Sequence, residues 1–159
     1  MPIPPVMPAV TTTVATTDPL AQIIELGRGA KHLASLTLPF EPVPASRPRV
    51  SRWGVYYAKT YKTWKKLAED YLQPGDLPVE QSDPLLVLTL AVVARPKKPT
   101  YDFPIPDVDN LAKGPMDVVT HATGYWHDDK QVTWLISGKR FTAPGEEPHT
   151  EVHIYRPCV

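Results

Sequence analysis

A nearly continuous apolar segment covers residues 85–94 and reads Leu-Leu-Val-Leu-Thr-Leu-Ala-Val-Val-Ala, with Thr89 as its one polar residue. It is far shorter than the roughly 18 residues of a membrane span and is rich in β-branched side chains, so it predicts a strand. Apolar residues occupy both alternating sets of positions, which is typical of a strand buried on both faces. The segment therefore predicts a sheet with this strand inside it.

Other segments of the chain predict the remaining strands and helices of a small domain. Alternating patterns predict further strands over residues 35–40, 132–141 and 150–155. The helical spacing of Tyr61, Trp64, Ala68 and Tyr71 predicts a helix over 59–72, which Gln73-Pro-Gly75 ends. Together with a second helix near residue 115, these elements predict one α+β domain with a mixed four-stranded sheet and two main helices.

The N-terminal part has a different composition. Residues 1–18 are rich in Pro and Thr and carry no charge before Asp18, so we expect a disordered tail there. Residues 19–34 are predicted to form a short lead-in of unknown role, with a helix over 19–26 that starts near Pro19 and ends at Gly27. The domain itself is predicted over residues 35–157.

The chain has a formal net charge of zero, but its charges are segregated. No acidic residue interrupts a basic band between positions 47 and 66, which contains Arg47, Arg49, Arg52, Lys59, Lys62, Lys65 and Lys66. A second basic cluster holds Arg95, Lys97 and Lys98. This separation predicts a polyanionic partner. The single cysteine, Cys158, excludes an intrachain disulfide, and the N-terminus does not resemble a secretory signal.

Acidic residues gather further along the chain. Asp107 and Asp109 are two positions apart, so on an extended segment both carboxylates can meet one cation; Asp109 can alternatively cap a following helix. Asp128 and Asp129 follow about twenty residues later, at the mouth of the next predicted strand. Oxygen ligands without Cys or an obvious His pair favour Mg²⁺ or Mn²⁺ over Zn²⁺.

Ordinary structural roles compete with this metal site. The spacing of Asp109, Lys113 and Asp117 also fits a surface salt-bridge ladder on a helix, and Asp128-Asp129 also fits a simple turn. An EF-hand is excluded because the ligand, glycine and glutamate positions of its loop are filled by Leu111, Ala112 and Val118.

Gly114-Pro115 affects where the helix that follows Asp109 can begin. A proline inside a helix costs about 3 kcal/mol or kinks it, whereas proline is favoured in the first turn. The pair therefore predicts a tight turn from Asp109 to Lys113 and a helix from about Pro115 to Ala122. Asp117 would then be a structural carboxylate near a helix N-terminus rather than a ligand.

The acidic stretch resembles the signature of the RusA family of Holliday junction resolvases, Asp-x-Asp-Asn-Leu-x-Lys-x-x-x-Asp followed by Gly-x-x-x-Asp-Asp-x-Gln-Val. The fixed positions are filled by Asp107, Asp109, Asn110, Leu111, Lys113, Asp117, Gly124, Asp128, Asp129, Gln131 and Val132. Residues 47–57 also resemble the basic segment of phage and prophage members, and the resemblance extends from about Leu36 to Tyr155.

The resemblance implies a small homodimeric endonuclease with a RusA-like fold that cuts four-way DNA junctions in recombination and repair, using Mg²⁺ or Mn²⁺, in the cytoplasm of a bacterial or phage-infected cell. It assigns the essential aspartates to Asp107, Asp109 and Asp129 and the required lysine to Lys113. Asp128 matches a neighbouring position and is an additional candidate ligand.

The basic band supplies candidate DNA contacts. We predict contacts from Arg47, Arg49, Arg52, Tyr57, Lys59 and Lys62. Lys65 and Lys66 fit a solvated helix face better. Trp64 is predicted to lie in the core, while Tyr57 and Trp126 are candidates either for stacking on bases or for the core. Two alternatives to junction resolution are a non-catalytic protein that binds branched DNA and a metal nuclease acting on flaps or single strands.

Overall fold

The computed structural model describes residues 18–47, 49–56, 59–75, 77 and 79–158, with only the backbone described at residues 49 and 54–56. Three α-helices, six strands and one 3₁₀ turn are assigned in this part of the chain. In order they are α1 (Pro19–Gly29), β1 (Lys31–Leu38), β2 (Arg49–Ser51), β3 (Gly54–Tyr56), α2 (Lys59–Tyr71), β4 (Leu85–Val93), α3 (Val108–Ala122), η1 (Asp129–Gln131), β5 (Val132–Phe141) and β6 (His149–Arg156). The predicted α+β domain is confirmed.

The main sheet is mixed and has the strand order β1-β6-β4-β5. β4 pairs in parallel with β5 and antiparallel with β6, and β6 pairs antiparallel with β1. The apolar segment is thus an internal strand, as predicted, and Leu85 and Val87 are fully buried. Because β4 and β5 are parallel, the chain must cross back between them, and α3 is this crossover.

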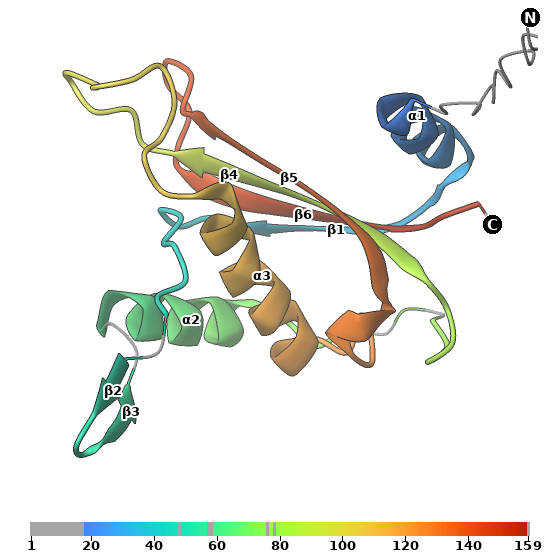
Figure 1. Ribbon diagram of the computed structural model, residues 1–159, viewed down its shortest axis with the longest axis horizontal. Helices are drawn as coiled ribbons and strands as arrows, with labels where there is room; N and C mark the ends of the chain where they lie inside the picture. Colours follow the sequence, from blue (N-terminus) through green and yellow to red (C-terminus); the bar gives the residue numbers. More distant parts are fainter. Residues whose placement is uncertain (1–17, 48, 57–58, 76, 78, 159) are drawn as a thin grey trace, which may run out of the picture.

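The core lies between one face of the sheet and helices α2 and α3, as Figure 1 shows. From α2 it receives Tyr61, Trp64 and Ala68, as the helical spacing predicted. From the sheet it receives Val152 and Ile154, which are fully buried. α1 lies beside the opposite face and buries none of its residues. No helix in the described residues is both long and apolar enough to cross a bilayer.

Two predicted N-terminal boundaries were wrong. The Asp18 carboxylate accepts a bond from the Leu20 amide and Pro19 opens α1, but the helix runs past Gly27 to Gly29. β1 begins at Lys31 instead of Ser35 because it pairs with β6 as far as Arg156. Its first residues do not alternate between exposed and buried, so they gave no period-two signal. Of the predicted tail, residues 1–17 lie outside the described residues.

The predicted break at Gly114-Pro115 was also wrong, because α3 is continuous from Val108 to Ala122 and contains Pro115. A Cβ at Gly114 would lie 2.9 Å from Cζ3 of Trp64, so this glycine allows α2 and α3 to approach closely. Pro115 is itself fully buried. Burial of the apolar face of α3 offsets the lost helical hydrogen bond, which local propensity alone does not take into account.

The segment before α2 forms a second, smaller sheet. β2 and β3 form a two-stranded antiparallel hairpin whose turn contains Arg52 and Trp53. Figure 1 shows that the hairpin projects away from the main sheet, beyond α2.

Candidate active site

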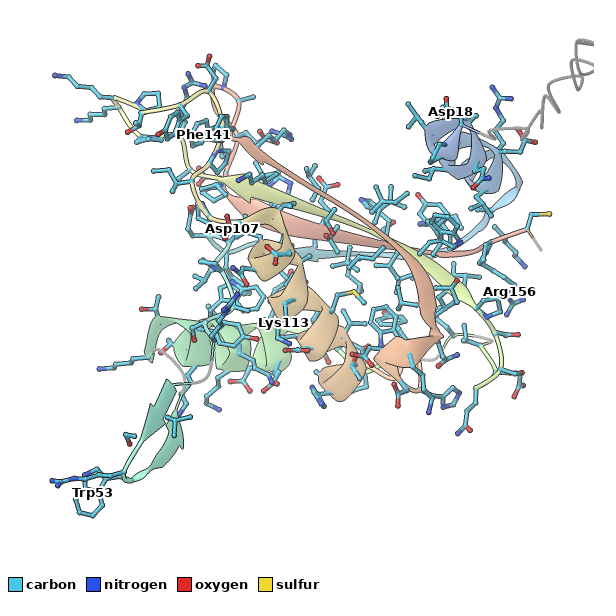
Figure 2. All side chains as sticks on the ribbon, viewed as in Figure 1. Asp18, Trp53, Asp107, Lys113, Phe141 and Arg156 are labelled. Atoms are coloured by element: carbon cyan, nitrogen blue, oxygen red, sulfur yellow. The ribbon has the colours of Figure 1, made fainter. Side chains whose placement is uncertain are left out.

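Asp107 and Asp109 lie at the N-terminal end of α3, as Figure 2 shows for Asp107. Asp107 rather than Asp109 occupies the N-cap position, so the predicted capping role of Asp109 was wrong. The Asp107 backbone is extended, and its side chain makes no capping hydrogen bond to the helix. Asp109 lies in the first turn, and both residues are exposed. Both carboxylates are therefore available to a ligand near the positive end of the helix dipole.

The loop that leads to Asp107 is anchored at both ends. At its start, the Glu41 carboxylate accepts a hydrogen bond from the Ala94 amide, with both oxygens at 3.2 Å. Burial is the main cause that raises the pKa of Glu41, although the bond to Ala94 opposes it. At the loop's end, Nζ of Lys139 donates to the Pro106 carbonyl at 2.7 Å. Lys139 belongs to β5, and sequence reasoning did not identify it as part of the site.

Lys113 lines a groove between α2 and α3. Because α3 is continuous, Lys113 follows Asp109 by four residues on the same helix face, and Asp117 follows Lys113 by four. The groove has a volume of about 300 Å³ and is lined by Tyr61, Lys62, Lys65, Lys66, Glu69, Lys113 and Asp117. The Tyr61 hydroxyl donates to Asp117 at 3.3 Å, which agrees with a structural role for this carboxylate. The groove offers a positively charged wall beside the candidate catalytic lysine.

Asp128 and Asp129 have different surroundings. The Asp128 carboxylate accepts a hydrogen bond from the Lys130 amide at 2.9 Å and caps η1. This backbone bond is the main reason that the pKa of Asp128 is lowered. Asp129 is exposed and follows the cap directly. Asp128 thus fits the turn role that competed with metal binding, whereas Asp129 remains available.

Gln131 fixes this turn, a role that sequence reasoning did not assign. Its buried side chain donates to the carbonyls of Glu80 and Asp83 at 2.8 and 3.1 Å. Its Oε1 accepts the His127 amide at 2.7 Å. One amide side chain therefore ties the segment before β4 to the segment that carries Asp129. In the sequence, the signal for this role was that Gln131 fills a fixed position of the signature to which no function had been assigned.

One chain does not bring Asp129 beside Asp107 and Asp109. Asp129 opens η1, which ends just before Val132, the first residue of β5, whereas Pro106 contacts Lys139, seven residues along that strand from Val132. Seven strand residues span about 23 Å, and the 15 residues of α3 span about 22 Å. Figure 1 accordingly shows η1 and the start of α3 at opposite ends of the helix. Among the described residues, no group of three or more His, Cys, Asp or Glu side chains could hold a metal ion.

The predicted DNA contacts surround the hairpin and α2. Arg47, Arg52, Lys59 and Lys62 are exposed. The guanidinium of Arg52 lies 5.0 Å from the centre of the Trp53 ring, at the hairpin tip labelled in Figure 2. The side chain of Arg49 and all of Tyr57 lie outside the described residues.

Several neighbouring candidates have structural surroundings instead. Trp64 is buried, as predicted, and Trp126 is only 2% exposed and so belongs to the core rather than to a base-stacking surface. Lys65 and Lys66 pair with Glu69 and Asp70 at 3.9 and 3.4 Å along the helix, as expected of a solvated face.

Exposed carboxylates at a helix N-terminus, a lysine-lined groove and a basic hairpin define an α+β protein whose site suits a cation and phosphates. A family model described as "Endodeoxyribonuclease RusA" matches residues 39–155, which is well over half of the chain. The chain therefore belongs to the RusA family of endodeoxyribonucleases, the enzymes that resolve Holliday junctions. The family implies a metal-dependent nuclease acting on branched DNA. No curated protein matches the chain.

Proposed function

We propose that this protein is a homodimeric, Mg²⁺-dependent endonuclease that resolves four-way DNA junctions by paired nicks, with Mn²⁺ as a possible substitute. Asp107, Asp109 and Asp129 are the proposed metal ligands, and Lys113 is the proposed catalytic cation. Asp128 is assigned to the support of Asp129, because its carboxylate already caps η1.

The separation of the aspartates carries the central part of this proposal. Two exposed carboxylates lie at one end of α3 and the third lies about 20 Å away in the same chain, beyond the reach of one ion. A metal site built from all three therefore requires Asp129 from a second copy. A twofold axis makes this exchange reciprocal, so a dimer has two such sites, one for each strand to be cut.

The proposed chemistry uses few groups. A bound Mg²⁺ would supply a Lewis acid for the phosphoryl group and activate water. The protein's own residues supply position and charge. Lys113 lies four residues beyond Asp109 on α3 and places a fixed positive charge where phosphoryl oxygens become more negative, or orients the water. Arg47, Arg52 and Lys62 are proposed to hold the phosphates on either side.

A mixed-dimer experiment tests the shared site. Asp109→Asn and Asp129→Asn are expected to inactivate their homodimers because each removes a ligand charge. The two variants, carrying different tags, are co-expressed and the mixed dimer is purified. It is expected to contain one complete site and to nick one strand of a fixed four-way junction in Mg²⁺.

A matched mixed dimer provides the control. Combining Asp107→Asn with Asp109→Asn damages both sites in every arrangement, and this dimer should be inactive. If the Asp109→Asn and Asp129→Asn mixed dimer is also inactive although it forms and binds junctions, the shared site is refuted. Mn²⁺ binding, followed by electron paramagnetic resonance, gives a readout that does not depend on cleavage. Flap and single-strand substrates in the same assay separate a junction resolvase from a nuclease of other substrates.

A further inference from the structure

The loop from Ala94 to Pro106 carries an aromatic pair that the proposed mechanism does not use. The rings of Tyr101 and Phe103 are nearly parallel, with centroids 5.1 Å apart and an interplanar angle of 6°. Their exposed fractions are 53% and 52%. Figure 1 shows that this loop projects beyond the end of the sheet, between β4 and the start of α3. The pair thus forms an open aromatic surface four to six residues before Asp107.

The surface is held in place by contacts from the sheet. The ammonium of Lys139 lies 5.5 Å from the centre of the Phe103 ring and also donates to the Pro106 carbonyl. At the other end of the loop, the Arg95 amide donates to the Thr142 hydroxyl at 3.2 Å. Lys139 therefore couples the aromatic pair directly to the backbone next to Asp107. A surface fixed before binding loses little conformational entropy when a ligand stacks on it.

The charge of the loop indicates what kind of ligand fits. Arg95, Lys97 and Lys98 are exposed, and Asp102 is the loop's only acidic residue. Aromatic rings flanked by cations suit a nucleotide, whose base stacks while its phosphate is paired. In continuous duplex DNA both faces of each base are covered by neighbours, whereas a branch point can release a base face. The loop therefore suits branched DNA better than linear DNA.

We propose that Tyr101, supported by Phe103 and Lys139, is a stacking platform for an unstacked base at the branch point. The base on this platform places its adjoining phosphate beside Asp107 and Asp109, so Tyr101 is a positioning and specificity-determining residue. The proposal rests on the proposed function, because it takes branched DNA as the ligand. Stacking of one base on an aromatic side chain predicts a preference of about tenfold for junction over duplex.

The test compares three variants in an Asp109→Asn background, which blocks cutting. Tyr101→Leu removes the ring, Tyr101→Phe keeps it, and Tyr71→Leu is the matched control. Tyr71 is 50% exposed and packs edge-on against Phe40 at 5.3 Å, in another part of the molecule. The probes are a fixed four-way junction with 2-aminopurine at its branch nucleotides and a linear duplex of the same sequence.

We expect Tyr101→Leu to weaken junction binding about tenfold and duplex binding less than about twofold. The 2-aminopurine signal should change when Tyr101→Phe binds and not when Tyr101→Leu binds. Equal losses on both substrates, no loss, or the same loss in Tyr71→Leu would overturn the proposal. Dissociation of the Tyr101→Leu dimer in size-exclusion chromatography would also overturn it, since the loop would then be a protein contact.

Failure of the platform can be told apart from failure of the proposed function. If the wild-type protein cuts junctions and the Tyr101→Leu variant binds them as tightly as wild type, only the platform is overturned. Wild-type protein that shows neither junction preference nor cleavage in Mg²⁺ overturns both proposals.

Discussion

The close contact between α2 and α3 at Gly114 makes a strong prediction about stability. Replacing glycine by alanine inside a helix normally stabilises it by about 1 kcal/mol. At Gly114 the added Cβ would lie 2.9 Å from Cζ3 of Trp64 and 3.3 Å from Cε2 of Tyr61. Both rings are only 4% exposed and cannot swing into solvent. Overpacking of this kind costs about 1–3 kcal/mol, so Gly114→Ala should lower the free energy of unfolding by about 1 kcal/mol.

Chemical denaturation, followed by circular dichroism, measures this change, and the melting temperature should fall by about 3 °C. Gly138→Ala is the matched control, because its Cβ would meet Leu90 at an ordinary 3.5 Å. The control should change stability by less than about 0.5 kcal/mol. If Gly114→Ala is as stable as wild type or more stable, the packing argument is refuted.

A double-mutant cycle locates the cause in Trp64. Trp64→Phe removes two of the three atoms that the new methyl group would meet, Cζ3 and Cη2 of Trp64, together with a buried Nε1 that has no hydrogen-bond partner among the described residues. The loss caused by Gly114→Ala should therefore be smaller in the Trp64→Phe background. Additive effects would show that the two positions do not clash.

Three further predictions concern the turn, the pH dependence and DNA binding. Gln131→Ala should lower the free energy of unfolding by about 2 kcal/mol in denaturation, because it strands buried backbone groups. The pKa of His149 is raised, first by its bond to the Glu147 carbonyl and then by Glu151. The stabilisation from protonated His149 should be complete below the ordinary histidine pKa of 6.5 and should fade as the pH rises through the raised pKa. The wild-type protein should therefore unfold at a higher denaturant concentration at pH 6 than at pH 8. Arg52→Ala should reduce the slope of log binding constant against log salt by about 0.9.

Each of these predictions has a control or a refuting result. Gln81→Ala, an exposed glutamine in the same segment, should leave stability unchanged. A His149→Gln variant with the same stability difference between pH 6 and pH 8 as wild type would contradict the histidine assignment. For the salt slope, Arg28→Ala on α1 is the control, because its exposed side chain pairs with Glu25 one turn away on the same helix. An unchanged slope for Arg52→Ala would remove this arginine from the DNA-binding surface.

The sequence determined the elements whose signals are local. The nearly continuous apolar run specified β4, the spacing of Tyr61, Trp64 and Ala68 specified α2, and the alternation of Val152 and Ile154 specified β6. Each of these patterns follows from which sides of a periodic backbone are buried, one side for α2 and both for β4, so residues close in sequence carry the information.

The errors fell where distant residues decide the outcome. Gly114-Pro115 favours a helix start in isolation, yet contact with Trp64 and burial of Pro115 make it the middle of α3. The first half of β1 shows no alternation and exists because β6 pairs with it. At Pro115 tertiary contacts outweighed a local preference of about 3 kcal/mol, whereas in β1 strand pairing supplied what the local pattern lacked.

The site divides in the same way. From residue type and spacing, the sequence alone made the carboxylates and the basic band candidates for the site, and resemblance to the RusA signature added the lysine. Only the fold revealed that a full-length crossover helix separates Asp107 from Asp129, and that Gln131 and Lys139 fix the two ends of the site. Sequence spacing does not reveal this separation, because the distance between residues joined by a helix depends on whether that helix stays unbroken.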